Sequence, residues 1–578
     1  MSINYETYKQ KALESVKDVF VKEYKNSIGI PMPEIEFIMP DEDSYKTGQY
    51  YISIHETWQI HLNFGLLPVS YKDFQEEVRV LTRHEVGHYM CCPFDVITHF
   101  RMLKVVIDTF NNYYVRKYPL INIAVLAGDL ANQAADIIVD TVNFRRNKQE
   151  TLKSEINWIS KGADFQRIPR HCKLMFLTKE NLWEESLNLN ENDEELLTEV
   201  KSLSKKFEEG GIANKKKFLA KIEAYTHSFF KLFEQDQQEQ QQKKQGNKNN
   251  SDNGQSSSEQ QQQGQEDNSD NGQPQISPSK DSYQNGSQFV FQSPEKIQEA
   301  LAELAQETSI QMFNQILSAA GLDSLSDKEI KKVWFEAQSA DMIPIDEEAP
   351  VGSNDNYSYP TTWKLDDSIE DIDMMLTFSN SPIFIPGVTT KKWEQNSVFN
   401  FGDENKQIDL LLVVDTSGSM GDAESPNSNM HQAILVSYGL IHYFELTQSQ
   451  VALLCFSNNI TANVEWTKNY DEIKDNLLRN GNGSTNFPIT TVQNSIEKNK
   501  NGIVTVVITD GELVNVEASL DFFRDYLNDN NKLYIFLQNK KDDVNLKYKN
   551  LRDIGANIIF ALTAKEMCES VLNEIHEN

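Results

Sequence analysis

The last third of the chain alternates short apolar runs with helical stretches. Five runs rich in β-branched and other apolar residues cover 408–414, 451–456, 502–508, 532–537 and 556–562. Helical stretches such as 430–444 separate them. Because strands that alternate with helices pair in parallel and are covered on both faces, this order predicts a doubly wound parallel α/β sheet over residues 405–578.

A polar turn, Asp415-Thr-Ser-Gly-Ser419, directly follows the first apolar run. Thr485 and Asp510 occupy loops further along, and Asp510 directly follows the third run. Ligand sites of such sheets lie in loops at the carboxyl ends of strands. Mg²⁺ prefers oxygen ligands in octahedral geometry. We therefore predict a site for Mg²⁺ (or Mn²⁺) formed by Asp415, Ser417, Ser419, Thr485 and Asp510, with one position left for a carboxylate of a partner.

In these residues the chain resembles the von Willebrand factor A (VWA) domain. The metal-ion-dependent adhesion site of that family has the pattern Asp-x-Ser-x-Ser, then a Thr, then Asp-Gly, and every position is matched here. The resemblance covers residues 405–578 and implies docking of a protein partner. Taken alone, Asp415 to Ser419 would be equally compatible with a polar turn after a strand, but the matches at Thr485 and Asp510 favour a metal site.

The chain of 578 residues is too long for a single hydrophobic core. Residues 234–288 are mostly Gln, Asn, Ser, Gly, Asp, Glu and Lys, a composition that predicts a disordered linker. Residues 1–233 before it are expected to form an α-rich α+β domain with an extended portion over 34–62. Residues 289–404 after it are expected to be a helical and irregular bridging region, beginning with an amphipathic helix over 294–319.

The net charge of -31, from 86 acidic and 55 basic residues, argues against nucleic acid or an anionic membrane as the main partner. The five cysteines are scattered and form no C-x-x-C pair, which predicts a reducing compartment. The adjacent Cys91 and Cys92 are expected to be small buried side chains rather than metal ligands. With no leader-like segment and no long apolar run, we expect a cytoplasmic protein.

A second metal-binding pattern, His84-Glu85-Val-Gly-His88, lies in the N-terminal part. A helix is predicted over 74–90, preceded by a capping box that begins at Ser70. Histidines four residues apart lie on the same face of a helix, where both can bind zinc. Glu85 is then placed to act as general base on a zinc-activated water.

The third zinc ligand is expected to be Asp136. Asn132, Asp136 and Asp140 lie at successive i, i+4 positions of a predicted helix and therefore share one face. Asp140 or Asn132 is expected to hold a ligand histidine through its second ring nitrogen. His99 is the rival third ligand.

The His-Glu-x-x-His motif resembles that of the zincin metallopeptidases. More closely, the chain resembles a metallopeptidase-like family that carries Asn-x-Ala-x-Asp after this motif and a VWA-like domain at its C-terminus. Most zincins have Glu where Asp136 stands, and a metzincin is excluded because its third His would fall at Phe94. The resemblance implies that residues 58–63 form an edge strand bordering a substrate cleft. His55 and His61 are then surface residues.

Three classes of function follow. The first is a cytoplasmic zinc metallopeptidase whose VWA domain recruits substrates or regulators, with Arg145, Arg146 and His171 as candidates to stabilise an oxyanion. The second is a non-catalytic, Mg²⁺-dependent adaptor with a structural zinc. For either class the VWA resemblance implies a MoxR-type AAA+ ATPase as partner. An extracellular adhesin is disfavoured because neither a secretion signal nor a disulfide framework is evident.

Overall fold

The computed structural model divides the chain into two compact units. The first contains Met1–Gln292 and Gln315–Leu322, and the second contains Ser293–Asn314 and Asp323–Asn578. Within them the structure describes residues 5–24, 34–38, 52–54, 58–63, 70–161, 165–249, 294–322, 325–340, 342, 358–365, 367–380, 384–395, 408–478, 483–499, 501–528, 531–537, 547–560 and 563–576. Among these residues, no helix is both long enough and apolar enough to cross a lipid bilayer.

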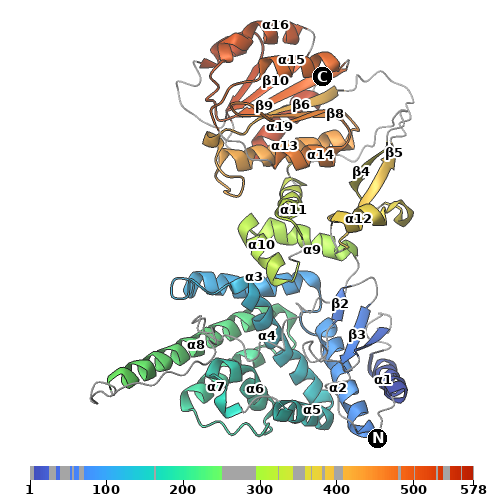
Figure 1. The fold of residues 1–578 in the computed structure, drawn as a ribbon, viewed down its shortest axis with the longest axis vertical. Helices are drawn as coiled ribbons and strands as arrows, with labels where there is room; N and C mark the ends of the chain where they lie inside the picture. Colours follow the sequence, from blue (N-terminus) through green and yellow to red (C-terminus); the bar gives the residue numbers. More distant parts are fainter. Residues whose placement is uncertain are drawn as a thin grey trace, which may run out of the picture. The chain divides into compact units, whose positions relative to one another are not determined.

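The first unit is mainly helical, which confirms that prediction (Figure 1). Its helices are α1 (Tyr5–Val19), α2 (Tyr71–Met90), α3 (Val96–Tyr113), α4 (Ile123–Arg146), α5 (Lys148–Lys161), α6 (Arg170–Trp183), α7 (Glu194–Glu208) and α8 (Phe218–Asn249). Helix α4 is central, because it contacts α2, α3, α5, α6 and α8 and most of its residues are buried. Polar side chains on such a helix are enclosed as well, so Asp136 and Asp140 need partners inside the unit.

Three short strands form a small sheet in the first unit. They are β1 (Glu34–Ile38), β2 (Ile52–Ile54) and β3 (Trp58–Asn63), all within or next to the predicted extended portion. The order is β1-β3-β2, so Gln59 and Ile60 of β3 are paired on both sides. The prediction of an edge strand over 58–63 is therefore wrong at Gln59 and Ile60, because their backbone is already paired with a strand on each side. His61 lies opposite Glu36 of β1, and His55 lies outside the described residues.

Two predicted boundaries near the linker also change. Helix α8 runs to Asn249, so residues 234–249 are helical rather than part of a disordered linker. Gln, Glu and Lys are good helix formers and extend a helix that is anchored by its buried first half. Residues 250–288 lie outside the described residues. The single helix predicted over 294–319 is two helices, α9 (Pro294–Glu307) and α10 (Ile310–Ala319), because the Ser309 hydroxyl accepts a hydrogen bond from Met312 N and starts a new helix.

The second unit contains a six-stranded sheet in the order β11-β10-β9-β6-β7-β8. The strands are β6 (Ile408–Asp415), β7 (Val451–Phe456), β8 (Ile460–Thr467), β9 (Gly502–Thr509), β10 (Lys532–Leu537) and β11 (Asn557–Phe560). All but β8 are parallel and coincide with the apolar runs of the sequence. Val414 pairs with Ile508, so the carboxyl ends of β6 and β9 are neighbours. Asp415 is the last residue of β6, and Asp510 directly follows β9.

Strand β8 was not predicted. It pairs antiparallel with β7, which makes the sheet mixed rather than wholly parallel. Residues of β7 are buried without interruption, whereas buried and more exposed residues alternate through the middle of β8. An edge strand is covered mainly on one face, so its apolar residues recur with a period of two and do not form a continuous run.

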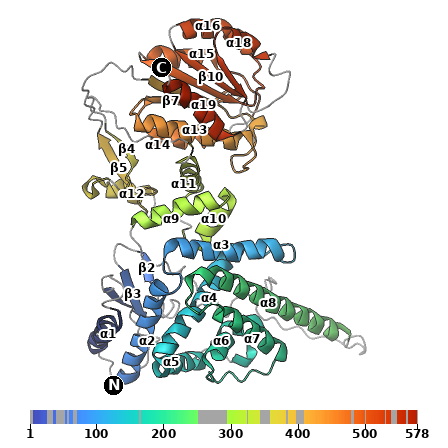
Figure 2. The ribbon, with the colours of Figure 1, turned by 180° about the vertical axis from the view of Figure 1, so that it is seen from behind.

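Helices cover both faces of this sheet (Figure 1; Figure 2). One layer contains α13 (Asn429–Leu446), α14 (Tyr470–Leu477) and α19 (Ala564–His576), and α13 contacts both other helices. The opposite layer contains α15 (Ile489–Lys498), α16 (Leu520–Asn528) and the short α18 (Lys549–Asp553). Val492 and Phe523 of this layer share an apolar core with Leu411 and Val413 of β6.

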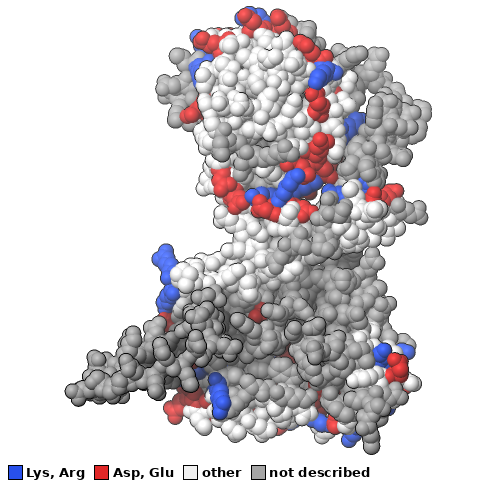
Figure 3. Space-filling view, viewed as in Figure 1, with Lys and Arg blue, Asp and Glu red and all other residues white. Residues whose placement is uncertain are grey.

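The predicted bridging region packs against the layer that contains α13. Helix α11 (Asp327–Ala340) contacts α13 and α14, and strands β4 (Ser358–Thr362) and β5 (Lys391–Gln395) form a ribbon, with α12 (Met374–Asn380) between them in sequence. Asp471 of α14 accepts hydrogen bonds from the backbone N and the hydroxyl of Thr362 (2.7 and 2.8 Å) and pairs with Lys332. Figure 3 shows basic and acidic side chains interspersed over this part of the unit. Charged contacts therefore join the bridging region to the sheet domain.

Candidate metal sites

Helices α2 and α4 bring the predicted zinc ligands together. The Ser70 side chain accepts a hydrogen bond from Asp73 N (3.5 Å) at the start of α2, as expected for the predicted capping box. His84 and His88 lie one turn apart on α2, and Asp136 lies in the middle of α4. The motif and its proposed third ligand therefore meet across one helix pair.

Gly87, between the two histidines, allows α2 and α4 to pack closely. A Cβ atom at this position would lie 2.4 Å from Val139 Cγ1 of α4. Two carbon atoms that are not bonded to each other do not approach this closely. We expect Gly87→Ala to lower the free energy of unfolding by about 1–3 kcal/mol in urea titrations of the metal-free protein. Because Val139→Ala removes the obstructing methyl group, the double variant should lose less than the sum of the single variants. Strict additivity would contradict the close contact.

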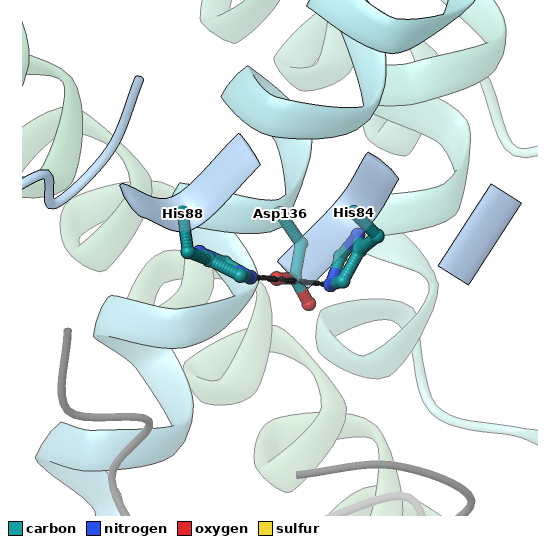
Figure 4. Close-up of side chains that lie close together, drawn as sticks. All are labelled: His84, His88 and Asp136. Carbon is teal, nitrogen blue, oxygen red and sulfur yellow. Dashed lines mark hydrogen bonds and ion pairs between the residues drawn. The ribbon is translucent and has the colours of Figure 1, made fainter. Parts of the chain in front are cut away.

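The side chains of His84, His88 and Asp136, the three predicted ligands, point toward one another (Figure 4). The Nε2 atoms of His84 and His88 are 3.1 Å apart, and Asp136 Oδ1 lies 3.5 Å from the first and 3.2 Å from the second. Tetrahedral zinc with bonds of about 2.0–2.1 Å needs ligand atoms roughly 3.3 Å apart. The observed separations are close to this value. The three residues therefore fit the ligand spacing that zinc requires.

The second ring nitrogen of each histidine is also held. His84 Nδ1 lies 2.7 Å from Asp140 Oδ1, and His88 Nδ1 lies 2.9 Å from the backbone oxygen of Cys92. A carbonyl oxygen only accepts, so His88 Nδ1 must carry the hydrogen, and in the neutral ring Nε2 has the free lone pair. Lone pairs from both rings then converge with a carboxylate oxygen, an arrangement that is stable only around a positive charge.

The pKa of His84 is raised, which means that the surrounding groups stabilise a positive charge at this position. Burial lowers the pKa, but the nearby carboxylates of Asp140 and Asp136 outweigh it and raise the pKa to about 10. In the metal-free protein a proton on His84 thus supplies the positive charge. Zinc would displace that proton, so zinc binding should weaken as the pH falls.

Glu85 is enclosed beside the cluster. Its side chain is on α2, three residues before His88, and the residue is 1 % exposed. Among the residues that the structure describes, Glu85 Oε2 has no hydrogen-bond partner. Burial raises the pKa of Glu85, while His84 and His88 lower it. A buried carboxyl group with a raised pKa is suited to accept and return a proton near neutral pH.

Other predicted residues of this site take different positions. Asp140 contacts the ring of His84, whereas Asn132 donates a hydrogen bond to Asp136 Oδ2 (3.4 Å). Of the two residues predicted to hold a histidine, Asp140 is therefore the one that does so. His99 is buried on α3 and is not part of the three-residue cluster. His171 is bound to Asp236 (2.7 Å) between aromatic rings of α8, so it is engaged in packing rather than directed at a substrate. Arg145 forms an ion pair with Glu208.

Sequence reasoning missed Lys179 of α6, whose Nζ lies 2.6 Å from Asp140 Oδ2. Burial would raise the pKa of Asp140, but Lys179 and His84 lower it well below its ordinary value. No motif marks this lysine, and it lies far from the ligands in sequence. The one available signal is a lysine within an otherwise largely apolar helical stretch, Cys172-Lys-Leu-Met-Phe-Leu-Thr-Lys179.

Four of the five predicted magnesium ligands, Asp415, Ser417, Ser419 and Asp510, lie at the carboxyl ends of β6 and β9. Asp415 Oδ1 accepts a hydrogen bond from Ser417 N (2.9 Å), and Oδ2 accepts one from the Thr509 hydroxyl (2.7 Å). The hydroxyl oxygens of Ser417 and Ser419 are 3.1 Å apart. Burial raises the pKa of Asp415, hydrogen bonds from Ser417 and Thr509 lower it, and the Asp510 carboxylate raises it again. Two neighbouring buried carboxylates are typical of a site that a cation neutralises.

Hydrogen bonds connect the loop that carries Thr485 to the loop that follows β9. Its backbone oxygen accepts a hydrogen bond from Val514 N (3.0 Å), in the loop that follows Asp510. The Asn515 side chain bonds both the backbone N and the backbone O of Phe487 (2.8 Å each). Hydrogen bonds therefore join the loops that carry Thr485 and Asp510.

Residues 410–512 match the family model of the von Willebrand factor type A domain. The chain carries a C-terminal VWA domain. No curated protein matched the chain in a sequence comparison.

Several solved structures are similar to part of the chain. One is an aerotolerance-related membrane protein from Bacteroides fragilis NCTC 9343, at 15% identity and TM-score 0.25, over 30% of this chain and 100% of that chain. A second is the conserved hypothetical protein BatB from Bacteroides thetaiotaomicron, at 14% identity and TM-score 0.24, over 29% and 98%. A third comprises three N-terminal domains of the type V pili tip protein Mfa5 from Porphyromonas gingivalis, at 12% identity and TM-score 0.18, over 29% and 28%.

The predicted ligands of the candidate magnesium site differ in their exposure to solvent. Asp415, Ser417, Thr485 and Asp510 are buried, whereas Ser419 is exposed. The buried side chains supply charge and hydroxyl oxygens from within the domain.

Proposed function

We propose that the first unit is a zinc-dependent peptidase and that the VWA domain docks a protein partner or substrate through Mg²⁺. One observation carries the peptidase proposal: ligand atoms of His84, His88 and Asp136 converge at tetrahedral spacing beside the buried carboxyl group of Glu85. A solvated helix face does not account for two imidazoles and a carboxylate that converge in the interior, next to a Glu85 oxygen that has no hydrogen-bond partner among the described residues.

Each residue has a distinct task in this proposal. Zinc held by the three ligands would polarise a peptide carbonyl and acidify a water molecule. Glu85 is placed to accept a proton from water and to return it to a leaving amine. Asp140 and the carbonyl of Cys92 keep the two imidazole rings oriented with Nε2 toward the ion. His84, with 19% of its side chain exposed, is on the side from which a substrate would enter.

The VWA domain supplies the second part of the proposal. Mg²⁺ held by the hydroxyl oxygens and carboxylates described above would leave a position for an acidic side chain of a partner. A MoxR-type AAA+ ATPase is the partner that we propose to test first, on the basis of the sequence resemblance. A cytoplasmic location remains a prediction.

A non-catalytic adaptor with a structural zinc is the second candidate function. It is favoured by the low exposure of the centre, since His88 is 2 % and Asp136 8 % exposed. The inner position of β3 also favours it, because that strand offers no free edge along Gln59 and Ile60 to a peptide. In this case the VWA domain would carry the function and zinc would stabilise the first unit.

One experiment separates the two candidates. Full-length protein loaded with one equivalent of zinc is incubated with a mixture of unstructured peptides, with and without a chelator, and products are identified by mass spectrometry. Cleavage that requires zinc supports the peptidase. Stoichiometric zinc without cleavage, even when Mg²⁺ and the candidate ATPase are added, favours the adaptor. Failure to bind zinc contradicts both.

The magnesium site has its own test. Because Asp415 is one of only two carboxylates among the proposed ligands, we expect Asp415→Ala to weaken Mn²⁺ binding, measured by electron paramagnetic resonance, by at least about tenfold. Zinc content should not change. Asp422→Ala is the matched control, since Asp422 is an exposed aspartate in the following loop. Equal Mn²⁺ affinity in wild type and Asp415→Ala would refute the assignment.

A further inference from the structure

A chain of buried polar contacts extends from the zinc ligands into the interior of the first unit. Asp140 uses both carboxylate oxygens: Oδ1 lies 2.7 Å from His84 Nδ1, and Oδ2 lies 2.6 Å from Lys179 Nζ. Lys179 also donates to Glu155 Oε1 (3.0 Å). The four residues come from α2, α4, α6 and α5, and Lys179 is only 3 % exposed.

Lys179 is placed to fix the orientation of the Asp140 carboxylate toward His84. A lysine this deeply buried needs compensating carboxylates, and a deeply buried carboxylate needs a cation or donors. With Lys179 present, Oδ2 of Asp140 is held by the lysine and Oδ1 is directed at the imidazole of His84. Without it, Asp140 Oδ2 and Glu155 Oε1 would both lose the donor that they share, and the Asp140 carboxylate would no longer be held in its orientation toward His84.

We propose that Lys179 is a positioning residue that acts through Asp140 on His84 and so sets the zinc affinity of the centre. The inference rests on the proposed zinc site and adds a residue that no metal-binding motif contains. It does not require the protein to be a peptidase, because a structural zinc would depend on the same contacts.

Lys173 provides a matched comparison on the same helix. It is 7 % exposed and pairs with Glu191 (2.6 Å), so it is also a buried lysine in an ion pair. Its ion pair is with a residue outside the zinc cluster. If Lys179 were simply a buried charge that stabilises α6, replacing either lysine would have the same consequences.

The test measures zinc affinity of full-length variants by competition with a chromophoric chelator. Lys179→Met is compared with wild type, and the pair is repeated in an Asp140→Asn background. Direct repulsion between the lysine and the ion is present in both backgrounds, so it cancels in the comparison. We expect Lys179→Met to lower zinc affinity by about 10–100-fold in the wild-type background. In the Asp140→Asn background the change should be within about twofold.

Lys173→Met should leave zinc affinity unchanged, and thermal unfolding of the metal-free variants shows whether each one folds. If Lys179→Met does not fold, Lys179→Gln keeps a polar side chain in the same place and is expected to change affinity in the same direction. Equal effects of Lys179→Met in both backgrounds, or an equal loss in Lys173→Met, would overturn the inference while leaving the zinc site intact. A wild-type protein that binds no zinc would overturn the proposed function itself.

Discussion

Replacing Glu85 with glutamine is expected to reduce peptide cleavage by at least about 100-fold while zinc remains bound. Glutamine has nearly the same size and shape, so the enclosed position beside His88 stays filled, but an amide cannot accept the proton. The substitution also removes a buried carboxyl group whose Oε2 has no partner in the described part of the chain, so the metal-free fold should not be weakened.

The measurement compares cleavage rate and zinc content in wild type and Glu85→Gln under identical loading. Glu77→Gln is the matched control, because Glu77 is a buried glutamate earlier on α2 and is not part of the zinc cluster. It should retain both zinc and activity. A Glu85→Gln variant that cleaves at the wild-type rate would show that this carboxylate is not the base.

The second large effect is expected at Asp136. Asp136→Ala removes the one carboxylate among the three ligands, leaving two histidines and a cavity, so zinc affinity should fall by more than the roughly 100-fold that loss of an outer hydrogen-bond partner causes. Chelator competition on the full-length protein measures this directly.

His99→Ala is the decisive comparison, since His99 was the rival ligand. Burial, with a smaller contribution from His88, lowers the pKa of His99 to about 4, so the ring is neutral and chemically able to bind zinc. It lies outside the cluster, however, and its replacement should cost far less zinc affinity than Asp136→Ala. The reverse order would assign the third ligand to α3 and leave Asp136 as an outer residue.

Local signals in the sequence located both candidate sites. The turn from Asp415 to Ser419 follows a strand that is buried almost throughout, and a ligand in that loop must lie at the end of the sheet. The spacing of His84 and His88 likewise defines one helix face. Such patterns depend on a few neighbouring residues and on a fixed helical or strand period, so sequence alone was sufficient for them.

Features that depend on contacts between distant segments could not be derived in this way. The inner position of β3 depends on its pairing with β1, which is separated from it in sequence. Strand β8 belongs to the sheet only because β7 offers it a partner. The need for glycine at position 87 arises only because Val139 of another helix packs against it. The same holds for Lys179, whose role appears only when α6 is packed beside α4.

The central claim is that one zinc ion binds between α2 and α4, and anomalous scattering tests it most directly. Crystals of the full-length chain grown with one equivalent of zinc would be measured on both sides of the zinc absorption edge. We predict a single strong anomalous peak within about 2.0–2.2 Å of His84 Nε2, His88 Nε2 and a carboxylate oxygen of Asp136. The absence of a peak there, or a peak bound by other residues, would contradict the account.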